Sequence, residues 1–202
     1  MAQSKARLTL VEGEGPPVAA DDGPDDFDAL FRRFAPYVGR IALSVLGAAD
    51  EVEDVVQEVF VIAHRHLGAV RDRAATKAWL SRVAVRESAR RLKRRRLKRI
   101  LGIAGDVADS PHLADHGATP EHRAMLLSIY RVLDRMPTAE RLAWTLRHVE
   151  GERLEAVAQL CGCSLATAKR RIAAASERVR AATGAPMVRP EPDAPREDDD
   201  DA

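Results

Sequence analysis

The chain of 202 residues is long enough for one or two small domains. Charged residues make up 31% and aromatic residues only 4%, which favours helical bundles, and the net charge of +1 hides a basic run at 86–99 and an acidic run at 197–201. No apolar run could span a bilayer, no signal peptide is recognisable, and Cys161 and Cys163 are too close together to staple a fold. We therefore expect a soluble, intracellular protein with reduced thiols and no metal or other cofactor.

The chain begins with a polar stretch and then a helical pattern. Residues 1–24 are interrupted by glycine and proline, and we expect them to be disordered. From Phe27 apolar residues recur at the spacing of one helical face, and the pattern resumes after Pro36. These features predict a helix that continues to Gly47.

Two further helices are expected in the first half of the chain. Asp50 with Glu53 three residues later resembles a capping box, and the apolar stripe that follows predicts a helix up to Gly68. A third helix is predicted from near Thr76, with Trp79 in the core. It becomes strongly basic towards residue 99, and we expect residues 100–118 to form a linker.

The second half begins with a cap and a proline. Thr119 followed by Pro120 predicts the start of a helix that ends before Pro137. Thr138 is predicted to cap the next helix, which ends at Gly151. The chain therefore predicts two small all-helical domains joined by a flexible linker, with a disordered acidic tail at 185–202.

Residues 151–180 are typical of a helix-turn-helix. A short helix with an apolar face is followed by Gly162, which can turn at positive φ, and by Ser164, a good N-cap. The second helix begins with a basic cluster and turns Leu165, Ala168 and Ile172 back towards the first. In such a motif the second helix enters the major groove of DNA, although an ordinary helical hairpin with a solvated basic face has the same pattern.

Two other surfaces have both a functional and a plain interpretation. The basic residues of 86–99 repel one another, which favours an external polyanion, but a solvated helix end is the simpler alternative. Asp54, Gln57 and Glu58 lie at i, i+3 and i+4 on one helical face. That face either binds a basic partner or only keeps the protein soluble. Nothing in the sequence suggests catalysis, so we expect no enzyme.

The order of these parts resembles the extracytoplasmic-function sigma factors of bacterial RNA polymerase. The resemblance depends on DVVQEVF at 54–60, AWLSRVAV at 78–85, the basic helix and the C-terminal helix-turn-helix. It implies a region 2-like domain at 25–99 and a region 4-like domain at 119–184, on either side of the expected linker at 100–118 and between the expected disordered ends at 1–24 and 185–202.

The resemblance also implies three contact surfaces. The surface that docks on the coiled coil of the polymerase's largest subunit is formed by Asp54, Gln57, Glu58 and Phe60. The helix around residues 83–94 reads and helps to melt the −10 promoter element, and its expected DNA-binding residues are Arg86, Arg90, Arg91, Arg94 and Arg95. Residues 154–176 read the −35 element, and the expected contacts there are Ser164, Thr167, Lys169, Arg170 and Arg171.

Several positions depart from the family's usual pattern. Arg86 stands where the family usually has asparagine, and Arg90 where it often has aspartate. Ala174 and Ser176 stand where basic residues are common in the reading helix. Promoter preference is therefore not transferable from relatives.

The expected function is promoter-specific transcription initiation in the bacterial cytoplasm. The expected partners are core RNA polymerase, through its coiled coil and flap region, and promoter DNA, with an anti-sigma protein as a further candidate and no membrane insertion or small-molecule substrate. One alternative is a helix-turn-helix regulator that binds DNA without polymerase. Another is an adaptor whose basic helix binds an acidic protein.

Overall fold

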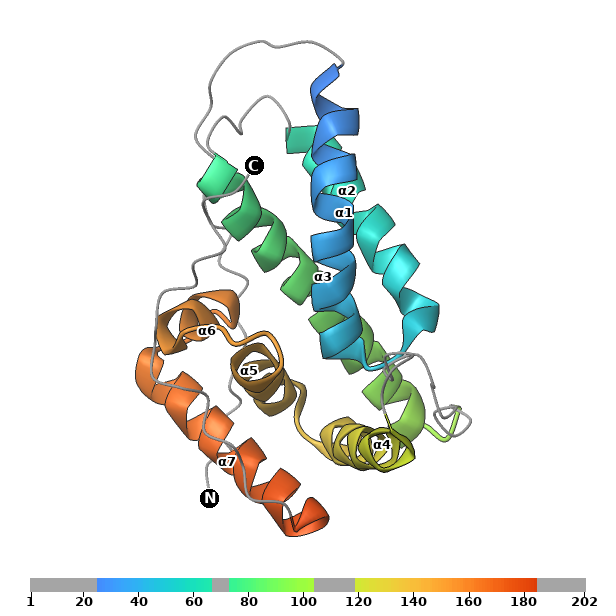
Figure 1. The fold of residues 1–202 in the computed structure, drawn as a ribbon, viewed down its shortest axis with the longest axis vertical. Helices are drawn as coiled ribbons and strands as arrows, with labels where there is room; N and C mark the ends of the chain where they lie inside the picture. The colour runs from blue at the N-terminus through green and yellow to red at the C-terminus, as the bar shows by residue number, and fades with distance from the viewer. Residues whose placement is uncertain (1–24, 67–72, 104–118, 185–202) are drawn as a thin grey trace.

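The computed structural model describes residues 25–66, 73–103 and 119–184, and these residues are helical apart from short turns (Figure 1). The prediction of an all-helical chain is confirmed. The predicted disordered segments and most of the predicted linker lie outside the described residues.

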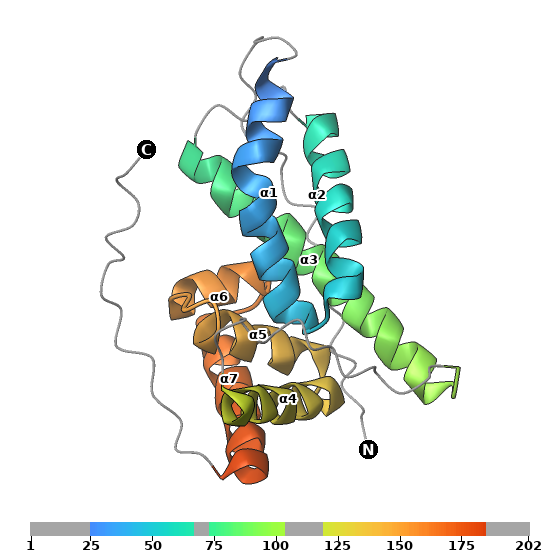
Figure 2. The ribbon, with the colours of Figure 1, turned by 45° about the vertical axis from the view of Figure 1, so that its right-hand side comes forward.

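The first domain is a three-helix unit of α1 (Asp25–Leu46), α2 (Val52–His66) and α3 (Arg73–Ile100). α1 and α2 lie side by side, and α3 packs across both of them (Figures 1 and 2). α1 passes through Pro36 without ending, and the Pro36 side chain is on the exposed side of the helix. The fully buried apolar side chains at the centre of this unit include Ile41, Val45, Val55, Val59, Leu80 and Val85.

The start of α2 differs from the predicted capping box. A 3₁₀ turn at Ala49–Glu51 precedes the helix, and its N-cap residue is Ala48, which has no side-chain cap. Asp50 and Glu51 instead accept from Arg95 of α3, at 3.4 and 2.9 Å. A long-range charged partner takes the place of the predicted local hydrogen bonds.

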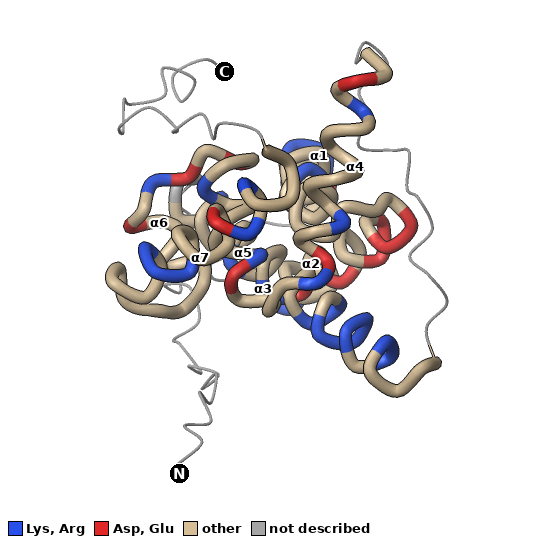
Figure 3. Tube along the Cα trace, turned by 90° about the horizontal axis from the view of Figure 1, so that it is seen from below, with Lys and Arg blue, Asp and Glu red and all other residues tan. Residues whose placement is uncertain are grey.

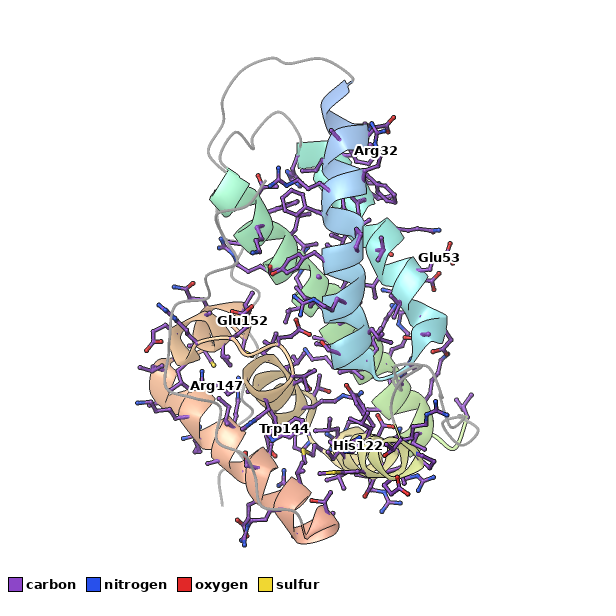
Figure 4. All side chains as sticks on the ribbon, in the orientation of Figure 1. Arg32, Glu53, His122, Trp144, Arg147 and Glu152 are labelled. Carbon is purple, nitrogen blue, oxygen red and sulfur yellow. The ribbon has the colours of Figure 1, made fainter. Side chains whose placement is uncertain are left out.

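The second domain contains α4 (Pro120–Arg135), α5 (Thr138–His148), α6 (Leu154–Leu160) and α7 (Leu165–Thr183). Thr119 caps α4 as predicted, accepting from the backbone N–H of His122 at 3.4 Å, with Pro120 in the first turn. The prediction that Thr138 caps α5 was wrong, because Pro137 holds the N-cap position and Thr138 is already helical. Figure 4 shows Trp144 between α5 and α7, where it is buried against the C-terminal half of α7.

The two domains pack against each other. α5 contacts α1 and α3, and α6 contacts α3. Leu142, Leu146 and Val157 belong to the same buried cluster as the core of the first domain. Figures 1 and 2 show α5 and α6 next to the middle of α3 in both views. The sequence predicted two domains but not this contact between them.

Candidate polymerase and DNA interfaces

A polar surface covers the outer side of α2. The side chain of Asp54 is 66% exposed, and Gln57 and Glu58 are exposed on the next turn. Because they are spaced at i, i+3 and i+4 on one continuous helix, the three side chains share a face. Glu53 points away from the bundle in Figure 4 and extends the acidic edge of this surface.

Phe60 does not belong to this surface. Its side chain is only 2% exposed, and its ring meets those of Phe27 and Phe31 edge-on at 6.3 and 4.7 Å between centroids. The prediction that Phe60 is part of the docking surface was wrong. The helical period places Phe60 beside the buried Val59 on the inner side of α2. Phe60 therefore supports the surface from beneath.

Two apolar side chains that the sequence did not single out complete this side of the domain. Val61 is 50% exposed and follows Glu58 by three residues, and Phe31 of α1 is 40% exposed over the Phe60 ring. Exposed apolar groups rimmed by polar ones are typical of protein interfaces. Val61 was detectable from its i+3 spacing, whereas the contribution of Phe31 depends on how α1 packs.

The middle of α3 has a buried inner face and an exposed, basic outer face. Val85, Ser88 and Ala89 are buried, whereas the side chains of Arg86 and Arg90 are 56% and 62% exposed. Between them Glu87 is buried and accepts from Arg90 at 2.9 Å. This hydrogen bond and the charge of Glu87 raise the pKa of Arg90. Glu87 therefore holds the exposed guanidiniums in place while offsetting part of their charge.

Further along α3 the predicted DNA-binding residues separate into two groups. Arg94 is exposed and has no ion pair with any described residue. Arg91 and Arg95 are only 12% and 18% exposed, and they pair with acidic side chains of the η1–α2 segment. Figure 3 shows Lys and Arg following α3 towards its C-terminal end. Arg86, Arg90 and Arg94 are therefore at the surface, whereas Arg91 and Arg95 are largely covered and form ion pairs within the domain.

The helix-turn-helix has the predicted turn chemistry. Gly162 has φ +58°, and the Ser164 hydroxyl accepts from the backbone N–H of Thr167 at 3.3 Å. The same hydroxyl donates to the Thr167 hydroxyl at 3.0 Å. Both predicted base-contacting hydroxyls therefore lie together at the N-terminal end of α7. Leu165 departs from expectation, because it is 37% exposed.

The three predicted DNA-contacting basic residues of α7 point in different directions. Ala168, Ala175 and Val179 mark the inner face of the helix, and Arg170 lies opposite to it. Arg171 is half-buried and lies near Cys161. Burial raises the pKa of the Cys161 thiol to about 12, and the Arg171 charge works against that shift. Lys169 is exposed beside Arg170, so these two present the most accessible charge.

Ser176, which stands where the family commonly has a basic residue, contacts a half-buried histidine. Ser176 is half-buried, and its hydroxyl lies 3.4 Å from Nε2 of His148. The His148 ring also lies against Trp144, with 5.0 Å between centroids. Burial, together with the charge of Arg147, lowers the pKa of His148. A long cation at position 176 would meet this half-buried imidazole.

Two helices with exposed basic residues, carried by two small helical domains, are typical of a DNA-binding protein. Comparison with known families refines this class. Residues 30–98 match Sigma-70 region 2, and residues 126–179 match Sigma-70, region 4. No described helix is long and apolar enough to cross a membrane.

Relatives and solved structures agree with these matches. The chain is 29% identical over 153 residues to the ECF RNA polymerase sigma factor SigM of Mycobacterium tuberculosis, covering 76% of this chain and 74% of that one. It is 28% identical over 163 residues to the ECF RNA polymerase sigma-E factor of Escherichia coli K12, covering 76% and 84%.

The fold is similar to that of the sigma factor RpoE from Bartonella quintana, solved with the anti-sigma factor NepR. The TM-score is 0.60 at 24% identity, covering 78% of this chain and 96% of that one. The fold is also similar to that of CnrH, solved with the cytosolic domain of CnrY, with a TM-score of 0.52 at 23% identity, covering 79% and 88%. The chain belongs to the sigma-70 family, and within it to the extracytoplasmic-function RNA polymerase sigma factors.

Proposed function

We propose that the outer face of α2 docks this sigma factor on the coiled coil of the polymerase's largest subunit. Gln57 and Glu58 are exposed at its centre, and Asp54 lies at its edge beside Arg91, at 3.8 Å. An amide and two carboxylates on one face suit a partner helix rich in arginine and lysine. Val61 and Phe31 add apolar area next to these polar groups.

The exposed cations of α3 contact the −10 element, and the N-terminal part of α7 contacts the −35 element. Arg86, Arg90 and Arg94 approach the phosphates of the −10 strand, where each neutralised phosphate releases a counterion. Capture of unstacked bases repays part of the cost of melting. On α7, Ser164, Thr167 and Arg170 are placed to reach base edges in the major groove.

Residues 25–99 form the region 2-like domain and residues 119–184 the region 4-like domain in this proposal, with 100–118 as the linker. The region 4-like domain also contacts the polymerase flap region. The protein acts in the bacterial cytoplasm and makes or breaks no bond itself. The solved sigma factor RpoE is bound to the anti-sigma factor NepR, so a protein of that type is a candidate regulator.

The observation that carries the proposal is the exposed acid–amide face of α2 on the same chain as a capped, basic reading helix. Run-off transcription with purified core polymerase tests it on three templates: a matching promoter, one with a scrambled −10 element and one with a scrambled −35 element. We expect transcripts only from the first. A chain that binds its site as tightly without core polymerase, and does not support run-off, would instead be a polymerase-independent regulator.

A further inference from the structure

The C-terminal part of α3 carries cations that have no acidic partner among the described residues. Lys93, Arg94 and Lys98 are exposed and form no ion pair there. Arg96 and Arg99 donate to carbonyls at the end of α4, at 3.2 and 2.7 Å, and a carbonyl dipole offsets only part of a full charge. Figure 3 shows this run of basic residues at the end of α3. Five cations without a described carboxylate partner therefore lie within about two turns of helix.

The same part of α3 exposes apolar side chains between these cations. Leu97, Ile100 and Leu101 are 56%, 72% and 60% exposed. Leu97 and Leu101 are four residues apart, and Arg94 and Lys98 have the same spacing, so leucines and cations lie in one stripe along the helix. An exposed apolar surface rimmed by charge is typical of an interaction site. The terminal face of α3 is defined here as Lys93, Arg94, Leu97, Lys98, Ile100 and Leu101.

Residues 185–202 have the charge that this face lacks. They contain seven acidic and two basic residues, and residues 197–201 are acidic without interruption. Met187 and Val188 precede the acids and supply apolar side chains. One short segment therefore complements the terminal face both in charge and in apolar character.

The end of α7 brings this segment within reach of the terminal face. Val179 of α7 is buried in one cluster with Leu133 and Met136 of α4, and Arg96 and Arg99 bond to the same end of α4. Figures 1 and 2 show the C-terminal ends of α3 and α7 on either side of α4. Two helix–helix spacings of about 8–10 Å separate these ends by about 20 Å. The stretch 185–196 extends to about 40 Å, so the acidic run reaches the face.

The other basic surfaces of the DNA-contacting helices fit an acidic segment less well. Arg86 and Arg90 share the carboxylate of Glu87, at 3.4 and 2.9 Å. On α7 only Lys169 and Arg170 are exposed without an acidic partner among the described residues. The terminal face of α3 therefore offers more uncompensated charge than either of these surfaces.

The covalent tether makes a weak contact sufficient. A single exposed ion pair contributes little to binding, because water screens it. Two segments of one chain, however, meet at an effective concentration in the millimolar range when the linker between them is short. The acidic run therefore occupies the face for most of the time when its dissociation constant is below about 1 mM. The contact weakens with salt, since exposed charges are screened over about 10 Å at 0.1 M.

We propose that the acidic run at 197–201 docks on the terminal face of α3 and competes there with DNA phosphates. Arg94 belongs both to this face and to the expected −10 contacts, so the acidic run and DNA exclude each other at that side chain. The consequence for DNA rests on the proposed function, whereas the docking itself does not. A run that is docked for about two thirds to nine tenths of the time raises the dissociation constant for DNA about three- to tenfold.

Distances between spin labels in the full-length chain test the docking. The labels are placed at Ile103→Cys, next to the terminal face, and at Ala202→Cys, next to the acidic run. Cys161 and Cys163 are replaced by alanine so that only these two sites react. In dilute buffer we expect a short-distance population, and at about 0.5 M salt we expect it to disappear.

Two variants remove one partner each. The first replaces the five acids at 197–201 by their amides and keeps the length of the chain. The second replaces the exposed, unpaired cations of the terminal face by glutamine: Lys93, Arg94 and Lys98. Each should reduce the short-distance population at least threefold, while circular dichroism confirms unchanged helical content.

A matched control removes the same charge elsewhere. It replaces Arg32, Arg33 and Arg65 by glutamine, and these three exposed residues lie near the start of α1 and the end of α2. Figures 1 and 4 show that this end of the first domain, where Arg32 is labelled, is opposite to the end of α3. The control should keep the short-distance population.

Binding of duplex DNA without polymerase tests the competition. The amide variant should bind about three- to tenfold more tightly than the unsubstituted chain in dilute buffer and equally at about 0.5 M salt. In the background of the three glutamines on α3 the same amide changes should have no further effect, because the two sets of charges act on each other.

The docking is overturned by either of two results. One is the absence of short distances in the unsubstituted chain. The other is an equal loss of short distances in the control, which would indicate attraction to net charge alone. Docking with unchanged DNA affinity in the amide variant refutes the competition. Run-off transcription keeps these failures apart from failure of the proposed function: an undocked chain that supports run-off refutes only the docking, and a docked chain that never supports it refutes the sigma function.

Discussion

Replacing Arg170 with alanine tests the −35 interface at the residue of α7 that lies opposite the core. The Arg170 side chain is exposed and pairs with no residue that the structure describes, so the fold loses no contact. A bidentate arginine–guanine pair in the major groove is worth about 1–3 kcal/mol of discrimination. Since about 1.4 kcal/mol is a factor of ten, we expect −35-dependent transcription to fall about 5- to 150-fold.

The assay is run-off transcription by the reconstituted holoenzyme on promoters with an intact or a scrambled −35 element. Arg180→Ala is the matched control, because Arg180 has the same charge on the same helix, is 59% exposed and lies about 15 Å further along. Arg170→Lys keeps the charge but loses the planar fork, so it should recover little discrimination. Equal losses for Arg170→Ala and Arg180→Ala, or full recovery by Arg170→Lys, would refute base reading by Arg170.

Three further predictions concern other surfaces. Gln57→Ala with Glu58→Ala should weaken capture of core polymerase while circular dichroism stays unchanged; undiminished capture would contradict the docking surface. Arg94→Ala should reduce the slope of log affinity against log salt for duplex promoter DNA by about 0.9, whereas Arg95→Ala, whose guanidinium pairs with acidic side chains, should change stability more than this slope. Burial and the adjacent arginine lower the pKa of His148 below its usual 6.5, so the unfolded chain binds more protons just below that pH. The free energy of unfolding should therefore decrease as the pH falls through about 6.5 and below, and His148→Gln should flatten this dependence in chemical denaturation.

Several features that depend on neighbouring residues were predictable from the sequence, although the predicted Thr138 cap was not among them. Ser164 caps α7 because its hydroxyl needs only the N–H of Thr167, three residues away. Gly162 turns the hairpin because glycine, which has no Cβ, adopts a positive φ without help from distant residues. The exposed face of α2 followed from helical spacing in the same way. Each of these predictions involves a separation of a few residues.

Features that depend on distant residues were not predictable. Asp50 has the spacing of a cap, but Arg95, 45 residues later, takes its carboxylate. Arg141 lies within a helical pattern and resembles any surface arginine, yet its acceptors in α1 are more than 90 residues away. Nothing in the periodicity of either helix encodes such a pair. The packing of the domains was inaccessible for the same reason.

The charge on α3 shows how structure changes a conclusion drawn from composition. Nine basic residues occur within 86–99, a density that by itself indicates a polyanion. Six of them bond to acidic side chains or to carbonyls at helix ends: Arg86, Arg90, Arg91, Arg95, Arg96 and Arg99. Lys93, Arg94 and Lys98 are exposed and have no such partner among the described residues. Repulsion along the helix is therefore relieved internally before any DNA is bound.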